Sequence, residues 1–353
     1  TEIIAGITTF LAMAYILAVN PSYLGGIDGM SAGAVFSATA ISAGIATLCM
    51  AFFANYPVAL ASGMGLNAFF AFTVCGAMGY SYKVALTAVF IEGIIFMLLS
   101  LFKFREALVN KIPSNLKFAI TAGIGLFIAI IALLNANVVV ASESTTVALG
   151  ELSSPTVVLS LVGLLIIGAL QHYKVPGGIL LGILITWVLG IIAQLVGWYV
   201  PNPEAGVYSV IPQFSLSSFE APKMFQFDFG FIAKNVPAFI LIVFTFLYTD
   251  IFDTVGTLIG VAEKGKLLDQ DGSLPNATGA LMADAVGTVV GACLGTSTVT
   301  SYVESSAGVA AGGRKGLTAV TTAVLFFISL IFAPIFTSIP SFATTPAMLY
   351  VGL

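Results

Sequence analysis

Apolar residues occur along this chain in long runs that are separated by short polar stretches. A helix needs about 20 mostly apolar residues to cross the hydrocarbon core of a bilayer. Eleven runs approach that length, and a twelfth begins near residue 344. The eleven cover residues 3–19, 31–54, 57–78, 84–102, 116–134, 156–172, 177–200, 231–262, 278–295, 297–311 and 316–334. The pattern predicts an all-α polytopic membrane protein.

Two of the runs do not suit a continuous helix that faces lipid. Proline and glycine residues interrupt the run 57–78, the third, and a polar stretch at 296–301 leads into the run 297–311, the tenth. We therefore expect short extended segments before half-helices 3 and 10. Membranes tolerate non-helical backbone only where protein or a water-filled cavity satisfies its polar groups. The two segments are accordingly expected in the interior.

Composition excludes the other broad classes of protein. Apolar residues make up 59% of the 353 residues and charged residues only 8%, against about 25% in an average soluble domain. The mean hydropathy is +1.07. A net charge of −4 and the lack of any basic run longer than two residues argue against nucleic acid as a partner. The three cysteines lie in apolar runs without CxxC spacing, and His172 is the only histidine, so we expect no metal and no cofactor.

The distribution of Lys and Arg predicts the orientation in the membrane. With residue 1 inside, the inner loops hold nine of these residues and the outer loops three. The inner nine are Lys103, Arg105, Lys111, Lys117, Lys174, Lys264, Lys266, Arg314 and Lys315, and the outer three are Lys83, Lys223 and Lys234. Positive loops face the cytoplasm. We therefore expect a multi-pass protein of the plasma (inner) membrane with a cytoplasmic N-terminal end and an outer loop at 201–230.

Seven spans precede that loop, so the first and eighth spans run in opposite directions. Two halves with odd span numbers have opposite topology, which is the inverted-repeat plan of secondary transporters. The two irregular runs occupy corresponding places in the halves. Thr9-Phe10-Leu11 in the first span also matches Thr245-Phe246-Leu247 in the eighth. These features favour a seven-plus-seven inverted repeat.

Five acidic residues fall inside the predicted spans, where a carboxyl group costs about 3 kcal/mol and usually marks function. They are Glu92, Asp250, Asp253, Asp284 and Glu304. Asp284 lies among small residues that suit tight helix packing, so a structural role is favoured for it. The role of Glu92 is left open.

Asp250 and Asp253 are spaced by three residues, so they share a helix face that Thr257 continues. Two carboxyl groups this close in a low dielectric disfavour joint ionisation, and one of them is expected to carry a proton. The structural alternative is a carboxyl group that caps a broken helix or bonds a neighbouring hydroxyl.

Glu304 and Asn67 hold corresponding places just after the two extended segments. Glu304 is expected in the first turn of half-helix 10, near the positive end of the helix dipole. Asn67 follows a glycine-containing stretch that permits close approach to a ligand, and its amide offers donors and an acceptor to a heterocycle. Helix capping is the alternative for both. Nearby aromatic residues belong to the core by default, with stacking on a planar ligand as the alternative; they are Phe10, Tyr15, Phe69, Phe70 and Tyr302.

Several motifs resemble those of the AzgA-like purine permeases, and they occur in the same order over the whole chain. They are Thr8-Thr-Phe-Leu-Ala-Met-Ala-Tyr-Ile16 with Val19-Asn-Pro21, Ala54-Asn-Tyr-Pro57, Gly63-Met-Gly-Leu-Asn-Ala-Phe-Phe70, Asp250-Ile-Phe-Asp-Thr-Val-Gly-Thr257 and Gly295-Thr-Ser-Thr-Val-Thr-Ser-Tyr-Val-Glu-Ser-Ser306. Ser62 stands where many relatives have Pro. The resemblance implies uptake of hypoxanthine, adenine or guanine with protons. It also implies a substrate site at Asn67, Asp250, Asp253 and Glu304, to which we add Phe69 and Thr257.

The resemblance further implies fourteen spans divided between a core and a gate domain, often in a homodimer. The core halves are expected at 1–104 and 231–334, and the first gate half at 116–200. The second gate half is expected to start at 335–353 in a trimmed chain whose last two or three spans are missing.

We expect a transporter and not an enzyme, with Asp250 and Glu304 coupling transport to protons rather than Na⁺. The first alternative is an anion transporter on the same fold, since paired helix N-termini attract anions. Glu304 between those termini would repel an anion. The second alternative is a membrane-embedded hydrolase that uses Asp250 and Asp253, but the second aspartyl motif that it would need is missing.

Overall fold

The computed structural model describes residues 1–101, 114–142, 145–201, 209–211, 220–269 and 274–352. Three predicted inner-loop cations, Lys103, Arg105 and Lys111, lie outside these ranges, as does much of the predicted outer loop 201–230. Among the described residues, eight helical segments are long and apolar enough to cross a membrane. They are Glu2–Leu24, Ala32–Phe53, Tyr82–Leu101, Pro155–His172, Gly178–Leu195, Val236–Gly265, Ala277–Leu294 and Gly316–Thr337. The chain is therefore an integral membrane protein, mostly helical as its apolar runs predict.

The chain divides into two compact units. Unit 1 contains Thr1–Phe118 and Phe219–Ala333, and unit 2 contains Ala119–Ser218 and Pro334–Leu353. Both units are built from two separate stretches of sequence. Whether the units act as a core and a gate stays a prediction, because those names describe a motion.

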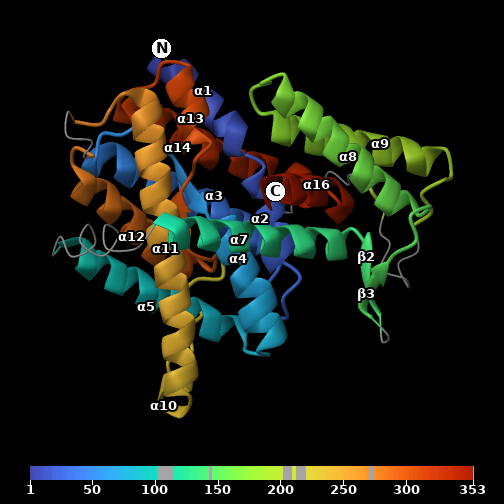
Figure 1. Ribbon diagram of the computed structural model, residues 1–353, viewed down its shortest axis with the longest axis horizontal. Helices are drawn as coiled ribbons and strands as arrows, with labels where there is room; N and C mark the ends of the chain where they lie inside the picture. Colours follow the sequence, from blue (N-terminus) through green and yellow to red (C-terminus); the bar gives the residue numbers. More distant parts are fainter. Residues whose placement is uncertain (102–113, 143–144, 202–208, 212–219, 270–273, 353) are drawn as a thin grey trace. The chain divides into compact units, whose positions relative to one another are not determined.

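Unit 1 holds most of the helices and one two-stranded sheet (Figure 1). Its elements are α1 (Glu2–Met13), α2 (Ile16–Leu24), α3 (Ala32–Phe53), β1 (Leu60–Ser62), α4 (Met64–Ala68), η1 (Phe69–Ala77), α5 (Tyr82–Leu101), α10 (Gly230–Lys234), α11 (Val236–Gly265), α12 (Ala277–Leu294), β4 (Val299–Ser301), α13 (Ser305–Ala310), α14 (Gly316–Ser329) and η4 (Leu330–Phe332).

Helices α3 and α12 form the centre of unit 1. They pack against each other, while α3 also packs on α14 and α12 on α5. Small residues permit this close approach, as in other membrane helices. A Cβ atom on Gly287 of α12 would lie 2.7 Å from that of Ala46, and one on Gly44 of α3 would meet the Phe327 ring of α14 at 2.5 Å.

The two irregular runs contain the expected extended segments. Strand β1 leads into α4, and strand β4 precedes α13. The strands pair with each other in antiparallel register, with Leu60 opposite Ser301 and Ser62 opposite Val299. This part of the prediction is confirmed, and the pairing explains how extended backbone exists at this depth: each strand satisfies polar groups of the other.

Three local features were not expected from the sequence. The first run is not one helix, because it breaks between α1 and α2 at Ala14 and Tyr15. The third run continues from α4 into a π-helix, η1, and such wide turns often occur at functional sites. Helix α13 has only six residues, so Glu304 precedes a single short helix rather than a long half-helix.

Unit 2 is formed by helices and one hairpin. Its elements are α7 (Ser114–Asn135, mainly in this unit), β2 (Val139–Ser142), β3 (Thr146–Leu149), α8 (Pro155–His172), α9 (Gly178–Leu195), α15 (Ala333–Thr337) and α16 (Ser341–Gly352). Helices α8, α9 and α16 pack on one another. The antiparallel β2–β3 hairpin, in which Val139 lies opposite Leu149, was not predicted.

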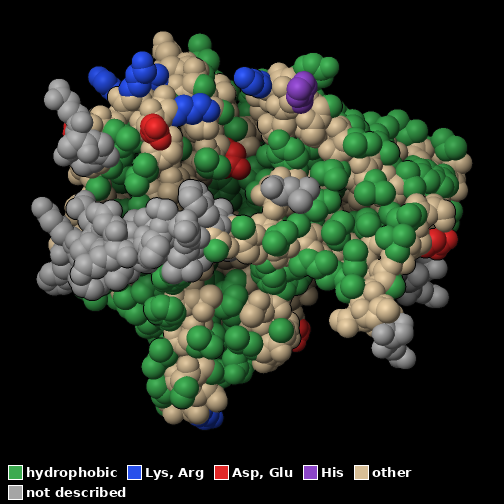
Figure 2. All heavy atoms as spheres, viewed as in Figure 1, with side chains coloured by type: hydrophobic (Ala, Val, Ile, Leu, Met, Phe, Trp, Pro, Cys, Tyr) green, Lys and Arg blue, Asp and Glu red, His purple; other side chains and the backbone are tan. Residues whose placement is uncertain are grey.

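The surface agrees with a lipid environment. Figure 2 shows hydrophobic side chains widely distributed over the visible face. In unit 1, α11 carries Lys264 near its C-terminal end, while Lys234 ends α10 at the opposite end. Large side chains such as Ile240, Leu241 and Phe244 on α11 are more than half exposed, which a soluble protein rarely tolerates.

Candidate functional site

The β1–β4 ribbon forms the floor of the candidate site in unit 1, and threonines on the two central helices support it. Thr47 of α3 bonds Leu60 twice: its hydroxyl donates to the carbonyl at 3.1 Å and accepts from the amide at 3.0 Å. Thr288 of α12 donates to the carbonyl of Val299 at 2.9 Å. The ribbon is thereby pinned on both sides, and its position relative to the helices is defined.

Glu304 lies at the end of this ribbon, directly before α13, and is half-buried. The hydroxyl of Tyr15, at the break between α1 and α2, donates to Glu304 Oε1 at 2.6 Å. Tyr15 itself is buried. The unexpected helix break therefore has a consequence for the site, because it brings a buried donor to the predicted carboxyl group.

Asp253 of α11 is exposed and lies close enough to Glu304 for the two carboxyl groups to repel each other. Thr300 of β4 is near Asp253 as well. Two acidic side chains from separate parts of the sequence are thus combined at the end of the ribbon. Simultaneous ionisation of both carboxyl groups is unfavourable, so a proton or a ligand N–H group between them relieves the repulsion.

Asp250, the other member of the predicted acidic pair, is buried and has Thr254 as its partner, and Thr300 connects that threonine to the surroundings of Asp253. Thr254, one turn further along α11, is 3.4 Å from Asp250 Oδ1 and 2.9 Å from Asp284 Oδ1. Its hydroxyl oxygen is also 2.9 Å from that of Thr300, and Ser301 donates to Asp284 Oδ1 at 3.1 Å. The two aspartates on α11 therefore have distinct surroundings, one inside the helix bundle and one at its edge.

Asp284 links α12 to α11 and β4 through these hydroxyl groups, which agrees with the structural role favoured for it. Glu92 of α5 is also fully buried, and its Oε2 accepts from Thr298 at 3.3 Å. Both carboxyl groups thus hold the polar residues that lead into or form β4.

Asn67 is the fourth residue of α4 and is completely buried. Its Oδ1 accepts from the Ser62 hydroxyl at 2.8 Å, while its Nδ2 has no hydrogen-bond partner among the described residues. The side chain does not cap α4. Ser62 also ties Asn67 to the other half of the site, because the Tyr302 hydroxyl donates to the Ser62 carbonyl at 2.5 Å.

Phe69 and Thr257 complete the set of predicted residues. Phe69 is half-buried at the start of η1, and its ring meets Phe246 of α11 edge to face with 4.9 Å between centroids. Thr257 is buried on α11, one turn beyond Asp253. Of the six predicted residues, Glu304, Asp253 and Phe69 are reachable from the surface in this conformation, while Asn67, Asp250 and Thr257 lie beneath it.

Sequence reasoning missed the hydroxyl and amide groups that organise the site. Ser62, Thr254 and Thr300 are each buried and hydrogen-bonded to a predicted residue or its partner. The polar stretch 296–301 was an available signal, since its side chains must find partners in the membrane. Asn20, buried in an apolar helix, was a second such signal.

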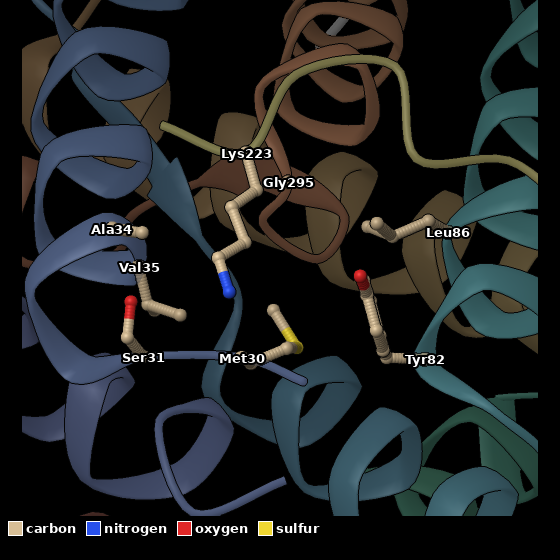
Figure 3. A pocket seen from close by; sticks show the side chains of 8 residues that line it. All are labelled: Met30, Ser31, Ala34, Val35, Tyr82, Leu86, Lys223 and Gly295. Carbon is tan, nitrogen blue, oxygen red and sulfur yellow. The ribbon is translucent and has the colours of Figure 1, made fainter. Parts of the chain in front are cut away.

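A small hollow lies elsewhere in unit 1, away from all of the predicted residues. It is lined by Met30, Ser31, Ala34, Val35, Tyr82, Leu86, Lys223 and Gly295. Figure 3 shows Lys223 extending into it toward Met30 and Val35, with Tyr82 across from them. The Lys223 ammonium donates to the Gly29 carbonyl at 2.8 Å, so it fastens the segment after Phe219 to the turn before α3.

Comparison with known proteins gives matches over the entire chain. A family model described as "Permease family" matches residues 1–353. The adenine permease AdeQ of Escherichia coli is 42% identical over 353 residues, which cover 100% of this chain and 76% of the relative. The guanine/hypoxanthine permease PbuO of Bacillus subtilis is 45% identical over 360 residues, which cover 99% of this chain and 79% of the relative.

A solved structure has the same fold at low sequence identity. The transmembrane domain of the cyanobacterial bicarbonate transporter BicA superposes with a TM-score of 0.72 and 15% identity, over 99% of this chain and 87% of that domain. Identity this low establishes the similarity of fold alone.

Proposed function

Because this chain belongs to the permease family, we propose that it is a secondary transporter that carries purine nucleobases across the membrane together with a proton. The names of its relatives AdeQ and PbuO support the substrate class. The observation that carries the proposal is the union of Glu304 and Asp253, two reachable carboxyl groups, with the buried amide of Asn67 around one ribbon.

The chemistry of these groups suits a neutral purine. Carboxylates accept strongly from the N–H groups of a heterocycle, and an amide complements the adjoining polar edge. Phe69 offers a half-buried ring, while Asp250 and Thr257 are buried on α11. An anion is disfavoured, because the carboxyl groups of Asp253 and Glu304 would repel it.

Glu304 is our main candidate for the proton-carrying group, with Asp250 as the second. Protonation of Glu304 would remove the repulsion from Asp253 and leave Asp253 to accept from the substrate. The loaded site would then be neutral and could pass an apolar barrier at lower cost. Substrate and proton would be coupled because the binding of each removes unfavourable charge.

The proposal includes an inverted repeat of seven plus seven spans, with unit 1 as the core and unit 2 in the gate. The reciprocal packing of α3 on α14 and α12 on α5 around the β1–β4 ribbon supports the repeat. The Lys and Arg distribution supports a cytoplasmic N-terminal end in the plasma membrane. A homodimer is part of the same proposal.

Uptake by the full-length protein in proteoliposomes tests the function. Hypoxanthine, guanine, adenine, uracil and sulfate would be offered with an inward pH gradient, with and without a protonophore, and separately with a Na⁺ gradient. We expect purines to accumulate with the pH gradient and the protonophore to abolish accumulation.

Three outcomes would contradict parts of this proposal. Uptake of sulfate without purines would favour the anion transporter. Accumulation that follows Na⁺ and ignores pH would replace the proton by sodium. Release of a chemically altered product would favour the hydrolase.

A further inference from the structure

A chain of buried hydrogen bonds ends at the amide of Asn67. It begins at the carbonyl of Val35 and passes through Thr39, Asn20, Thr296 and Ser62. These four side chains and Asn67 have no exposed surface. They come from α2, α3, the residues before β4, β1 and α4, so the chain joins parts of unit 1 that are distant in sequence.

The direction of the first bonds is defined by the helix backbone. The Thr39 hydroxyl donates to the Val35 carbonyl at 2.7 Å, so its oxygen is left to accept. Asn20 therefore presents Nδ2, which donates to Thr39 at 2.7 Å and to Thr296 at 2.9 Å. A flipped amide would place Oδ1 against the Thr39 oxygen, whose hydrogen is already committed.

The same direction continues to Asn67. Thr296 accepts from Asn20, and its own hydrogen is available to the Ser62 oxygen at 3.3 Å. The Ser62 hydrogen then goes to Asn67 Oδ1 at 2.8 Å. If the Asn67 amide were reversed, its Nδ2 would donate to Ser62, and the Ser62 hydroxyl would donate to Thr296. The hydroxyl hydrogen of Thr296 would then have no acceptor among the described residues.

From this network we propose that Ser62 is a positioning residue that orients the Asn67 amide with its N–H groups toward the substrate, so that the site selects 6-oxopurines over adenine. The inference rests on the proposed function. Asn67 Oδ1 is occupied by Ser62, and Nδ2 is the atom left without a partner in the described part of the chain. Asn67 therefore has two N–H donors available, while its Oδ1 is turned toward Ser62.

Hydrogen-bond donors at this position complement the O6–N7 edge of a 6-oxopurine but not the corresponding edge of adenine. A 6-oxopurine presents two adjacent acceptors, O6 and N7, whereas adenine presents N7 beside an amino donor. In the same pose, the adenine amino group would face the Asn67 N–H groups. Discrimination of about tenfold is expected from such a mismatch.

The test measures dissociation constants of hypoxanthine and adenine for the full-length purified protein and its variants. The wild type is expected to bind hypoxanthine about tenfold more tightly than adenine. Ser62→Ala should release the Asn67 amide and reduce that ratio at least about threefold, because the amide can then turn its oxygen toward adenine. Thr296→Val interrupts the same chain while keeping the side-chain shape, and should reduce the ratio in the same direction.

Ser297→Ala is the matched control. Ser297 is equally buried, and its hydroxyl has no hydrogen-bond partner among the described residues, so its loss should leave the ratio unchanged. If Ser62 had only a structural role, Ser62→Ala would weaken the binding of both purines equally and leave the ratio of their dissociation constants unchanged. Unchanged ratios in Ser62→Ala and Thr296→Val, or a wild type that binds adenine as well as hypoxanthine, would overturn the inference while the proposed function stands. Failure of the wild type to bind any purine would overturn the proposed function and this inference with it.

Discussion

The two strand-led segments of unit 1 present different chemistry at corresponding places. The segment β1–α4 supplies a neutral amide, Asn67, which is fully buried and held by Ser62. The segment β4–α13 supplies an acid, Glu304, which is half-buried and held by Tyr15. An amide stays neutral over the physiological pH range, while a carboxyl group can gain or lose a charge. The difference suggests a division of labour: the first segment recognises the substrate and the second couples it to the proton.

The segments also differ in how they are anchored. Strand β1 is bonded to α3 through two hydrogen bonds of one side chain, Thr47, to Leu60. Strand β4 is bonded to α12 through Thr288 and Ser301, and its Thr300 hydroxyl lies 2.9 Å from that of Thr254 on α11. Segment β1–α4 continues into η1, whereas α13 ends after six residues and lies tightly against α1. The acidic segment therefore ends in the shorter helix, and that helix is positioned by α1.

The largest effect is expected from Glu304→Gln. Glutamine keeps the size and an acceptor oxygen for Tyr15 but cannot carry the proton. With an imposed gradient of two pH units, one coupled proton supports about hundredfold accumulation. The variant should lose that accumulation and keep hypoxanthine binding within a few fold, as measured by proteoliposome uptake and equilibrium binding. Gradient-driven accumulation by the variant would remove Glu304 from the coupling step.

The next effect concerns the anchoring of the strands. Thr47→Val would leave the buried amide and carbonyl of Leu60 without their partner, which costs about 2–4 kcal/mol. Thr288→Val removes the hydrogen-bond donor of a single backbone group, the carbonyl of Val299, so a loss of about 1 kcal/mol in the free energy of unfolding is expected. Thermal unfolding in detergent gives the two values. Equal losses would contradict the idea that Thr47 satisfies two backbone groups where Thr288 satisfies one.

A smaller effect is expected where α13 packs on α1. A Cβ atom on Gly308 would collide with the Thr9 hydroxyl and lie 2.6 Å from the Ala5 carbonyl. Gly308→Ala should therefore cost about 1–3 kcal/mol. In the other segment, a Cβ on Gly76 of η1 would be 3.4 Å from its nearest neighbour, so Gly76→Ala is the control with a change near zero. A stable Gly308→Ala protein would show that α13 can move away from α1.

The smallest effect is expected in the segment β1–α4, at the neutral side chain of Asn67. Asn67→Ala removes one partner of the substrate, and a loss of about tenfold in hypoxanthine affinity is expected. Proton dependence should stay as in the wild type, because an amide does not titrate. Equilibrium binding at two pH values measures both. Unchanged affinity in a folded variant would leave Asn67 with a structural role only.

Much of the site was visible in the sequence because charge is so costly in a membrane. Acidic residues are rare in apolar runs, so Asp250, Asp253 and Glu304 attracted attention without any structure. Gly63, Gly65 and the polar stretch 296–301 likewise indicated the two extended segments. What spacing predicted less well was the surroundings of the pair on α11. Asp250 and Asp253 share a helix, but one is buried beside Asp284 and the other is exposed beside Glu304.

Long apolar runs and isolated charges are local properties of the chain, so they were enough to predict the membrane class, most helices, the interrupted third and tenth runs, and the acidic residues. The tertiary structure alone decided the pairing of β1 with β4, the break that brings Tyr15 to Glu304, and the directed chain from Thr39 to Asn67. Each of these joins residues that are distant in sequence, and short polar side chains such as Ser62 and Thr296 give no local sign of which partner they will bond. Their roles follow from burial, since a polar group that is removed from water must find its partner inside the protein.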